Sequence, residues 1–228
     1  MTGAADFPRF QPVGDSAVLV EFGEVIDDAA YENVIRLDGL LAQHPVAGFV
    51  EAVPAYVSLL VAFDPLITDH GAVTKALQSL LRRASSAPVA GGRREVEVCY
   101  DGEFAPDMAE VMRQTGLDRE AVIAAHLEAL YRVYMYGFAP GYAYLGGTVP
   151  AIQLPRKASA VRDVAAGSVI IAGPQCIVTT LKMPTGWWVI GRSPTKILQS
   201  DATRPFLFDV GDEIMFKRIS RTQFDASV

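Results

Sequence analysis

The stretch GFAPGYAYLGG, residues 137–147, decides the fold of the C-terminal half of the chain. Four glycines and one proline in these eleven residues are incompatible with a helix or a regular strand ladder, so we predict an ordered loop. Eight glycines fall between residues 137 and 191, and between them lie three short β-rich segments, at 168–171, 176–180 and 187–190. Short strands separated by glycine turns are typical of a compact β-barrel or sandwich, which is the fold we predict here.

The loop itself has two interpretations that its residues leave open. Glycines let backbone N–H groups approach an anion or a carbonyl, and Phe138, Tyr142 and Tyr144 add stacking surface, which favours a binding loop. The same composition also suits a tight barrel corner filled by aromatic side chains. The loop carries neither phosphate-loop signature, because one requires GxxxxGK[ST] and the other requires GxGxxG after a strand.

The first ninety residues carry the pattern of a small α+β domain. Alternating apolar residues predict strands at 18–22, 49–53 and 56–63. Two helices are predicted, one capped by Asp27 or Asp28 and one starting at Asp69, each with an apolar stripe at helical spacing. The order strand, helix, strand, strand, helix indicates a sheet covered on one face by helices.

A segment of small residues, proline and glycine at 85–92 is typical of a linker. We therefore expect an N-terminal domain over 1–88 and a second domain over 93–228. The arginines that bracket the linker favour solvated surface over a phosphate-binding patch, because they form separated pairs; they are Arg82, Arg83, Arg93 and Arg94.

The second domain is predicted to open with a strand at 94–100 and two short helices, the first ending at Gly116 and the second capped by Asp118. His126 lies on the apolar face of the second helix. It is either a core histidine bonded to a carbonyl or a general base or substrate donor. Cys176 is either its nucleophilic partner or a small buried apolar residue.

Composition and charge exclude several classes of function. Half of the residues are apolar and 20% are charged, so the chain is globular and not disordered. The net charge of −6 provides no footprint for a nucleic acid backbone. Two cysteines are too few for a disulfide scaffold, and three histidines lack any ligand spacing, so we expect a cytoplasmic protein without a metal site. The apolar runs predict neither a signal peptide nor a membrane span.

Four segments together resemble a known family: YRVYMYGFAPGYAYLGG from Tyr131, LPRK from Leu154, AAGSVIIAGPQ from Ala165 and PTGWWVIGRSP from Pro184. They are similar to subunit 1 of the allophanate hydrolase family, which includes the B-type subunit of 5-oxoprolinase and the kinase inhibitor KipI. The N-terminal GDSAVLVEFG also matches, so the resemblance covers nearly the whole chain. It implies a small α+β N-terminal domain followed by a cyclophilin-like β-barrel, and a likeness to the carboxyltransferase part of urea carboxylase.

The resemblance also implies a set of site residues. His126 and Arg156 stand where the family has its helix histidine and its first Pro-Arg, and they are the expected catalytic residues. The expected substrate-binding or partner-binding residues are Phe138, Pro140, Gly141, Tyr142, Tyr144, Gln175, Gly186 and Trp187. The sequence departs from the family at the second Pro-Arg, because Ala160-Val161 occupies that place and Arg162 follows one position later. A one-residue displacement on a strand points a side chain to the opposite face.

As a function, the resemblance implies an ATP-dependent 5-oxoprolinase that opens 5-oxo-L-proline to L-glutamate and is inactive as this chain alone. The implied partners are a subunit 2-like protein, which is the C-type subunit of 5-oxoprolinase, and a lactam-utilisation protein, which is the A-type one. ATP would activate the amide oxygen, and Arg156 would hold the substrate carboxylate. His126 would position or deprotonate a reacting group. Two alternatives stay open, processing of urea or allophanate and inhibition of a histidine kinase.

Overall fold

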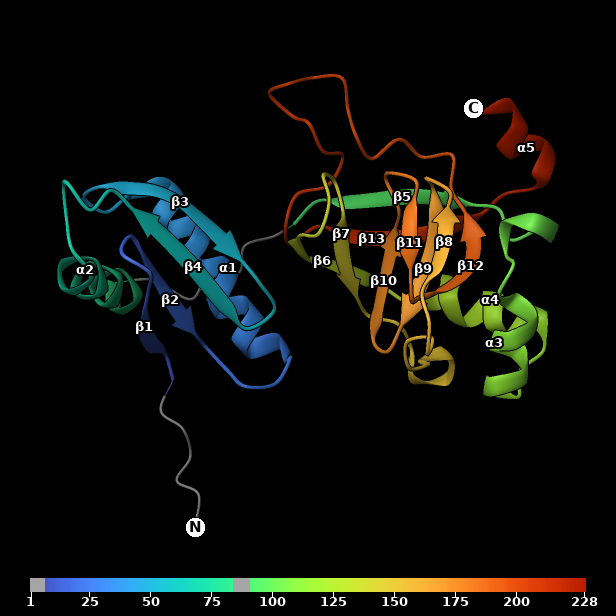
Figure 1. Ribbon diagram of the computed structural model, residues 1–228, viewed down its shortest axis with the longest axis horizontal. Coiled ribbons are helices and arrows are strands. Elements are labelled where there is room, and N and C mark those ends of the chain that lie inside the picture. Colours follow the sequence, from blue (N-terminus) through green and yellow to red (C-terminus); the bar gives the residue numbers. More distant parts are fainter. Residues whose placement is uncertain (1–6, 84–90) are drawn as a thin grey trace, which may run out of the picture. The chain divides into compact units, whose positions relative to one another are not determined.

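The computed structural model describes residues 7–83 and 91–228, and the chain forms two compact units, Met1–Ala90 and Gly91–Val228. Figure 1 shows that the first unit combines helices with a small sheet, whereas the second is dominated by strands. The predicted linker at 85–92 lies largely outside the described residues, which omit 84–90.

The N-terminal unit is an antiparallel four-stranded sheet, in the order β1-β2-β4-β3, with two helices. Its elements are β1 (Arg9–Val13), β2 (Ala17–Glu21), α1 (Asp28–Gln43), β3 (Phe49–Pro54), β4 (Ser58–Phe63) and α2 (His70–Arg83). Val20 of β2 and Val61 of β4 are fully buried and share one core cluster with Leu37 of α1 and Leu77 of α2. Both helices therefore cover the same face of the sheet, as predicted.

Strand β1 is an element that the sequence pattern does not predict. It pairs antiparallel with β2 at the edge of the sheet, and none of its residues is fully buried. Pro12 lies within it, and an edge strand tolerates proline because one side of its backbone needs no partner. A half-exposed strand that contains proline lacks the alternation on which strand prediction depends.

The second unit contains a seven-stranded sheet in the order β12-β9-β10-β7-β6-β13-β5 and a separate pair, β11-β8. Its strands are β5 (Arg93–Val98), β6 (Tyr131–Tyr136), β7 (Ala143–Gly146), β8 (Val161–Val164), β9 (Ser168–Ala172), β10 (Gln175–Val178), β11 (Met183–Thr185), β12 (Trp188–Arg192) and β13 (Glu213–Arg218). Its helical elements are η1 (Gly102–Phe104), α3 (Met108–Thr115), α4 (Arg119–Glu128), η2 (Pro150–Ile152) and α5 (Arg221–Ala226).

The two ends of this sheet meet and close it into a barrel. Cys99, which follows β5, and Arg192, the last residue of β12, exchange two backbone hydrogen bonds of 2.8 Å. This one bridge joins the two ends of the sheet, next to β5 and at the end of β12, so the barrel is nearly closed. The predicted α+β class and the predicted β-barrel are thereby confirmed.

Strands β9 and β10 separate two apolar clusters. Ile171 and Cys176 belong to the large cluster inside the barrel. Their neighbours Ile170 and Ile177 point the other way and belong to a second cluster on the outer face, which Val164 of β8 joins. This division follows from the two-residue period of a strand, and it explains why both strands are apolar on both faces after their first residues, Ser168 and Gln175.

The glycine-rich stretch is only partly a loop, so the prediction that it excludes a strand ladder was wrong. Its second half, β7, pairs with β6 on one side and with β10 on the other. The glycines and the proline of the stretch lie at 137–141 and at 146–147. Residues 143–145 between them can therefore adopt the extended backbone of a strand, with side chains on alternate faces. Gly146 has a packing role, because a Cβ there would lie 2.4 Å from the Tyr134 ring.

Candidate functional site

The turn at residues 137–142 is held together by hydrogen bonds between its own backbone groups. The Gly137 amide donates to the Tyr142 carbonyl at 3.2 Å, the Ala139 amide to the Gly137 carbonyl at 2.8 Å, and the Tyr142 amide to the Ala139 carbonyl at 3.0 Å. The Thr180 hydroxyl donates to the Pro140 carbonyl at 2.7 Å. Because these amides already have acceptors, the geometry favours the barrel-corner interpretation over an anion-binding loop.

Five predicted residues come together on the outside of the barrel, and we call them the aromatic surface: Phe138, Tyr142, Tyr144, Arg156 and Trp187. The ring centroids of Phe138 and Tyr142 are 5.6 Å apart, and those of Tyr144 and Trp187 are 6.0 Å apart. The Arg156 guanidinium carbon lies 5.6 Å from the Trp187 ring centroid, within the range of a cation–π contact. Tyr142 and Trp187 belong to the outer cluster, and Tyr144 packs against it, so the cluster brings residues from three separate segments together.

Exposure differs sharply within the aromatic surface. Tyr142 and Trp187 are 3% and 6% exposed, so they serve mainly as packing residues of the outer cluster. Phe138 is 72% exposed and has a φ of 70°, a left-handed conformation that is costly for a phenylalanine. An exposed aromatic ring held in a strained conformation marks Phe138 as the member of the patch best placed to meet another molecule.

The remaining predicted binding residues have structural contacts. Gly141 has a φ of 72°, and a Cβ there would lie 2.7 Å from Leu198, so a larger residue does not fit. The Gly186 carbonyl accepts from the Lys157 amide at 2.7 Å. Gln175 is half-buried at the start of β10, opposite Gly146 and Ala172.

His126 lies inside the barrel and not at the aromatic surface. It is completely buried on α4, and its ring packs against Phe216 and Tyr131 at centroid distances of 4.4 and 5.3 Å. Its Nδ1 is 2.8 Å from the Tyr100 hydroxyl, and its Nε2 is 3.5 Å from the Cys176 Sγ. The two residues expected to be catalytic are thus separated by the barrel wall, with His126 within it and Arg156 on its outer face.

The histidine and the cysteine meet, but their surroundings suppress charge on both. Burial lowers the pKa of His126 to about 3. Burial also raises the pKa of the Cys176 thiol well above its usual range. A nucleophilic pair of this kind needs a thiolate beside an imidazolium, so the neutral, fully buried pair agrees with the core interpretation. The partner of the histidine is a tyrosine hydroxyl, however, and not a backbone carbonyl.

A cleft of about 560 Å³ lies on the same outer side of the barrel wall. We call it the arginine cleft. Its lining combines three arginines and three carboxylates with an apolar wall: Arg162, Arg192, Arg221, Glu103, Asp163, Asp225, Phe104, Val164, Val189 and Phe224. Val164 and Val189 also belong to the outer cluster beneath the aromatic surface. The outer cluster and the arginine cleft therefore share these two side chains, and the cleft lies next to the cluster.

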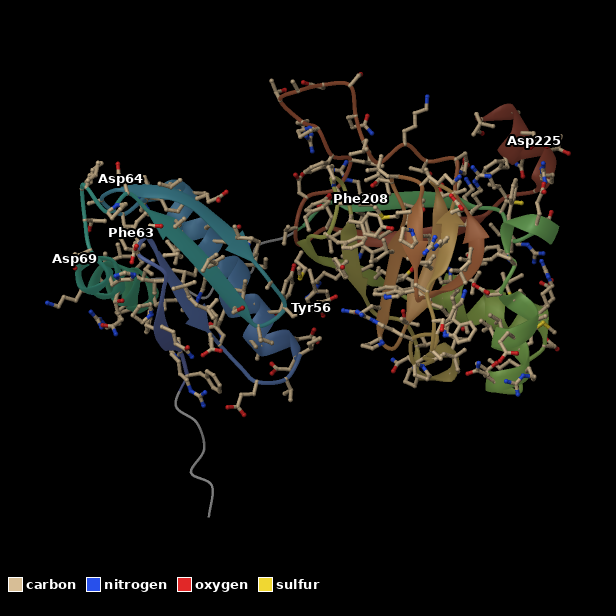
Figure 2. The ribbon with its side chains drawn as sticks, in the orientation of Figure 1. Tyr56, Phe63, Asp64, Asp69, Phe208 and Asp225 are labelled. Atoms are coloured by element: carbon tan, nitrogen blue, oxygen red, sulfur yellow. The ribbon has the colours of Figure 1, made fainter. Side chains whose placement is uncertain are left out.

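The charges around the arginine cleft leave two guanidinium groups without a carboxylate. Arg221 pairs with Glu103 and with Asp225, which Figure 2 labels on α5. The Arg192 Nε donates to a backbone carbonyl at 3.2 Å, and its guanidinium carbon lies 5.5 Å from the Phe104 ring centroid. Within the described residues, Arg162 has no hydrogen-bond or ion-pair partner. The remaining carboxylate of the lining, Asp163, pairs with Lys182 at 2.8 Å. Arg162 and Arg192 are therefore the two guanidinium groups that the cleft offers to an anion.

Sequence reasoning missed this cleft because its arginines come from distant segments. Arg162 is the residue displaced by one position from the family's second Pro-Arg, and it lies on β8. Arg192 is the last residue of β12, and the strand pattern around it gives no indication that it lines a site. Only the packing of α5 and β8 around the end of β12 brings these side chains to one opening.

The glycine-rich turn does not form a preformed cradle for the phosphates of ATP. The amides of Gly137, Ala139 and Tyr142 already have acceptors within the turn. Among the described residues there is also no group of three or more histidine, cysteine, aspartate or glutamate side chains that could hold a metal ion. Among the described helices, none is both long and apolar enough to cross a bilayer.

The chain is similar to proteins of one family. A family model described as the carboxyltransferase domain, subdomain C and D, matches residues 8–208. A protein from Bacillus subtilis (strain 168), named as the B subunit of 5-oxoprolinase, is 36% identical over 229 residues, which cover 96% of this chain and 95% of that protein.

Solved structures show the same relationship. The crystal structure of TTHA0988 is 33% identical with a TM-score of 0.79, and the match covers 90% of this chain but only 40% of that longer chain. The urea amidolyase of K. lactis shares the fold, with a TM-score of 0.77 at 17% identity, over 99% of this chain and 16% of that one. Because the family model covers most of its length, the chain belongs to the family of carboxyltransferase domains, subdomain C and D.

Proposed function

We propose that this chain is the B-type subunit of a 5-oxoprolinase complex, which hydrolyses 5-oxo-L-proline to L-glutamate. The observation that carries the proposal is the 36% identity, over almost the full length of both chains, to a protein that bears the name of this 5-oxoprolinase component. In this reaction water cleaves the lactam C–N bond, so that the ring carbonyl becomes a carboxylate and the ring nitrogen becomes an amine. ATP is proposed to be used by the assembled complex and bound outside the described residues.

We propose that the arginine cleft receives the substrate. 5-Oxoproline is a small ring that carries one carboxylate, and the cleft combines an apolar wall with the unpaired guanidinium of Arg162 and the carbonyl-bonded one of Arg192. A guanidinium binds a carboxylate through two parallel N–H donors, which fixes the orientation of the ring. Arg156, the carboxylate ligand expected from the sequence, is exposed on the aromatic surface and is the alternative ligand.

The proposed carboxylate contact predicts a defect in substrate binding. In the reconstituted complex, Arg162→Gln is expected to raise the KM for 5-oxoproline about tenfold, because a charge-assisted hydrogen bond is lost while the neutral side chain keeps much of its length. Glutamate release at varied 5-oxoproline concentrations measures this effect. Lys196→Gln, which removes an exposed charge elsewhere in the same unit, is the matched control. An effect of Arg156→Gln with none of Arg162→Gln would move the carboxylate to the aromatic surface.

We also propose that Phe138 contacts the subunit 2-like partner. The related TTHA0988 chain is much longer than the part that this chain matches, which supports a neighbouring module in such assemblies. A lactam-utilisation protein, as the A-type component, is the third proposed member of the complex. The aromatic surface fits a partner contact because aromatic residues are enriched among the residues that dominate interface energies.

Phe138→Ala is expected to weaken binding to the subunit 2-like partner at least about tenfold, because the residue is 72% exposed and is free to contact a partner. Tyr142→Ala is expected to act differently, by lowering the melting temperature, since its side chain is almost fully buried. Co-elution and calorimetric titration measure the affinity, and Leu66→Ala, another exposed apolar truncation, is the control. Unchanged affinity for Phe138→Ala would remove the loop from the interface.

A further inference from the structure

A second cleft lies in the N-terminal unit, whereas the aromatic surface and the arginine cleft both belong to the barrel unit. It has a volume of about 590 Å³, within the range of small-molecule sites. Its apolar side is formed by Phe10 of β1 and Phe22 after β2, together with Phe7 at the start of the described chain. Phe10 and Phe22 also pack against the core of the unit, so this wall is anchored and not a loose surface patch.

The opposite side of this cleft is polar and cationic. Asn33 and Arg36 come from α1, and Gln78 and Arg82 come from α2. No aspartate or glutamate is among the described residues that line the cleft, although the whole chain carries a net charge of −6. Two positive charges therefore face an aromatic wall without a compensating carboxylate in the lining.

Arg36 has unused hydrogen-bonding capacity. Its Nη2 donates to the Asn33 side-chain oxygen at 2.7 Å, which holds the guanidinium against α1. Its Nε is buried and has no partner among the described residues. An unpartnered buried donor costs free energy, so the position of this side chain is not explained by its contacts within the unit.

We propose that this cleft of the N-terminal unit binds a small aromatic or heteroaromatic anion, with its ring against Phe10 and Phe22 and its carboxylate or phosphate between Arg36 and Arg82. The side-chain amide of Gln78 supplies further hydrogen bonds to polar atoms on the ring, whereas Asn33, which donates to the Ala29 carbonyl and accepts from Arg36, orients the guanidinium. Aromatic walls favour a planar ligand through stacking, and guanidinium groups favour an anionic head through charge-assisted hydrogen bonds. This site goes beyond the proposed 5-oxoprolinase function, because 5-oxoproline has no aromatic ring.

The test titrates the full chain with phenyl phosphate, benzoate and the neutral benzyl alcohol, followed by calorimetry and by chemical-shift changes of residues in the N-terminal unit. We expect saturable binding of at least one of the two anions, and binding of benzyl alcohol at least about tenfold weaker. Stronger binding of phenyl phosphate would identify a phosphate head, and stronger binding of benzoate a carboxylate head.

Arg36→Gln and Arg82→Gln are each expected to weaken anion binding about tenfold. Arg82 is exposed, so its substitution tests the site even where Arg36→Gln disturbs folding. Lys75→Gln, which removes an exposed charge of α2 outside the cleft, is the matched control. Failure of both anions to saturate, equal affinity for benzyl alcohol, or an equal loss with Lys75→Gln would overturn the proposal. The 5-oxoprolinase assay does not enter these readouts, so the two proposals fail independently.

Discussion

Mixed with 5-oxoproline and ATP, the purified chain alone is expected to release no glutamate, whereas the reconstituted complex turns over. The nucleophile and base nearest to each other in the described residues, Cys176 and His126, are buried inside the barrel and held neutral. Three amides of the glycine-rich turn already have acceptors within the turn, and the described residues include no group of three or more side chains that could hold a metal ion. Opening an amide needs an activated carbonyl and a positioned nucleophile, and we expect other subunits to supply them.

The assay compares the chain alone, the chain with each proposed partner, and the full set, with glutamate measured directly. Addition of the complete set is expected to switch activity from background to full turnover. The control omits only this chain from the set, which shows that it is required. Turnover by the isolated chain above background would contradict the proposal and would direct attention to Arg162 and Arg192 as parts of a complete active site.

The stability of the barrel unit is expected to fall steeply in acid because of His126. Burial lowers the pKa of its imidazole from 6.5 to about 3, so between these pH values the unfolded chain binds a proton that the folded chain does not. The free energy of unfolding therefore decreases as the pH falls from 6.5 towards 3, by roughly 1.4 kcal/mol for each pH unit. Above pH 6.5 both states carry a neutral imidazole, and this contribution to the pH dependence disappears.

Chemical denaturation of the wild type and of His126→Gln across about pH 4 to 8 measures this difference, because carboxylate titration is common to both proteins and cancels. His126→Gln is expected to lose the extra acid sensitivity, whereas His44→Gln, at an exposed histidine, keeps it. Parallel curves for wild type and His126→Gln would contradict the assignment.

At neutral pH, His126→Ala is expected to lower the free energy of unfolding by about 3 kcal/mol. The substitution leaves a cavity and removes the partner of the Tyr100 hydroxyl. In the reconstituted complex, a loss of about a hundredfold in activity for a folded His126→Gln variant would restore His126 as a catalytic residue. Full activity of that variant would show that the role of His126 is purely structural.

Local signals in the sequence were sufficient for the helix ends and for much of the sheet. The carboxylates of Asp27 and Asp118 each accept a hydrogen bond of 2.8 Å from the amide three residues on. The Asp118 cap is as predicted, and of the two caps predicted for the first helix, Asp27 or Asp28, it is Asp27 that serves. Gly116 ends α3 with a φ of 73°. These features depend only on neighbouring residues, since capping and left-handed turns are decided within one turn of backbone.

Pairings between strands that are distant along the chain could not be predicted from the sequence pattern. Strand β13 lies parallel to β5, more than a hundred residues away, and the bridge between Cys99 and Arg192 closes the barrel. Neither pairing leaves a signal in local periodicity, because the same alternation is compatible with many partners. The strand in the second half of the glycine-rich stretch was likewise hidden, since its stability comes from β6 and β10 on either side.

The sequence by itself determined the α+β class and the residue types available for chemistry. Its strand pattern left a β-barrel or a sandwich open, and the family resemblance pointed to the barrel. Which of those residues meet was decided only by the tertiary structure. It placed His126 against Tyr100 and Cys176 inside the barrel, where burial lowers the pKa of the histidine and raises those of its two neighbours. It also brought Arg162 and Arg192 together at an open cleft. The physical reason is that hydrophobic patterning specifies which face of an element is buried, whereas exposure and charge pairing depend on which elements pack against that face.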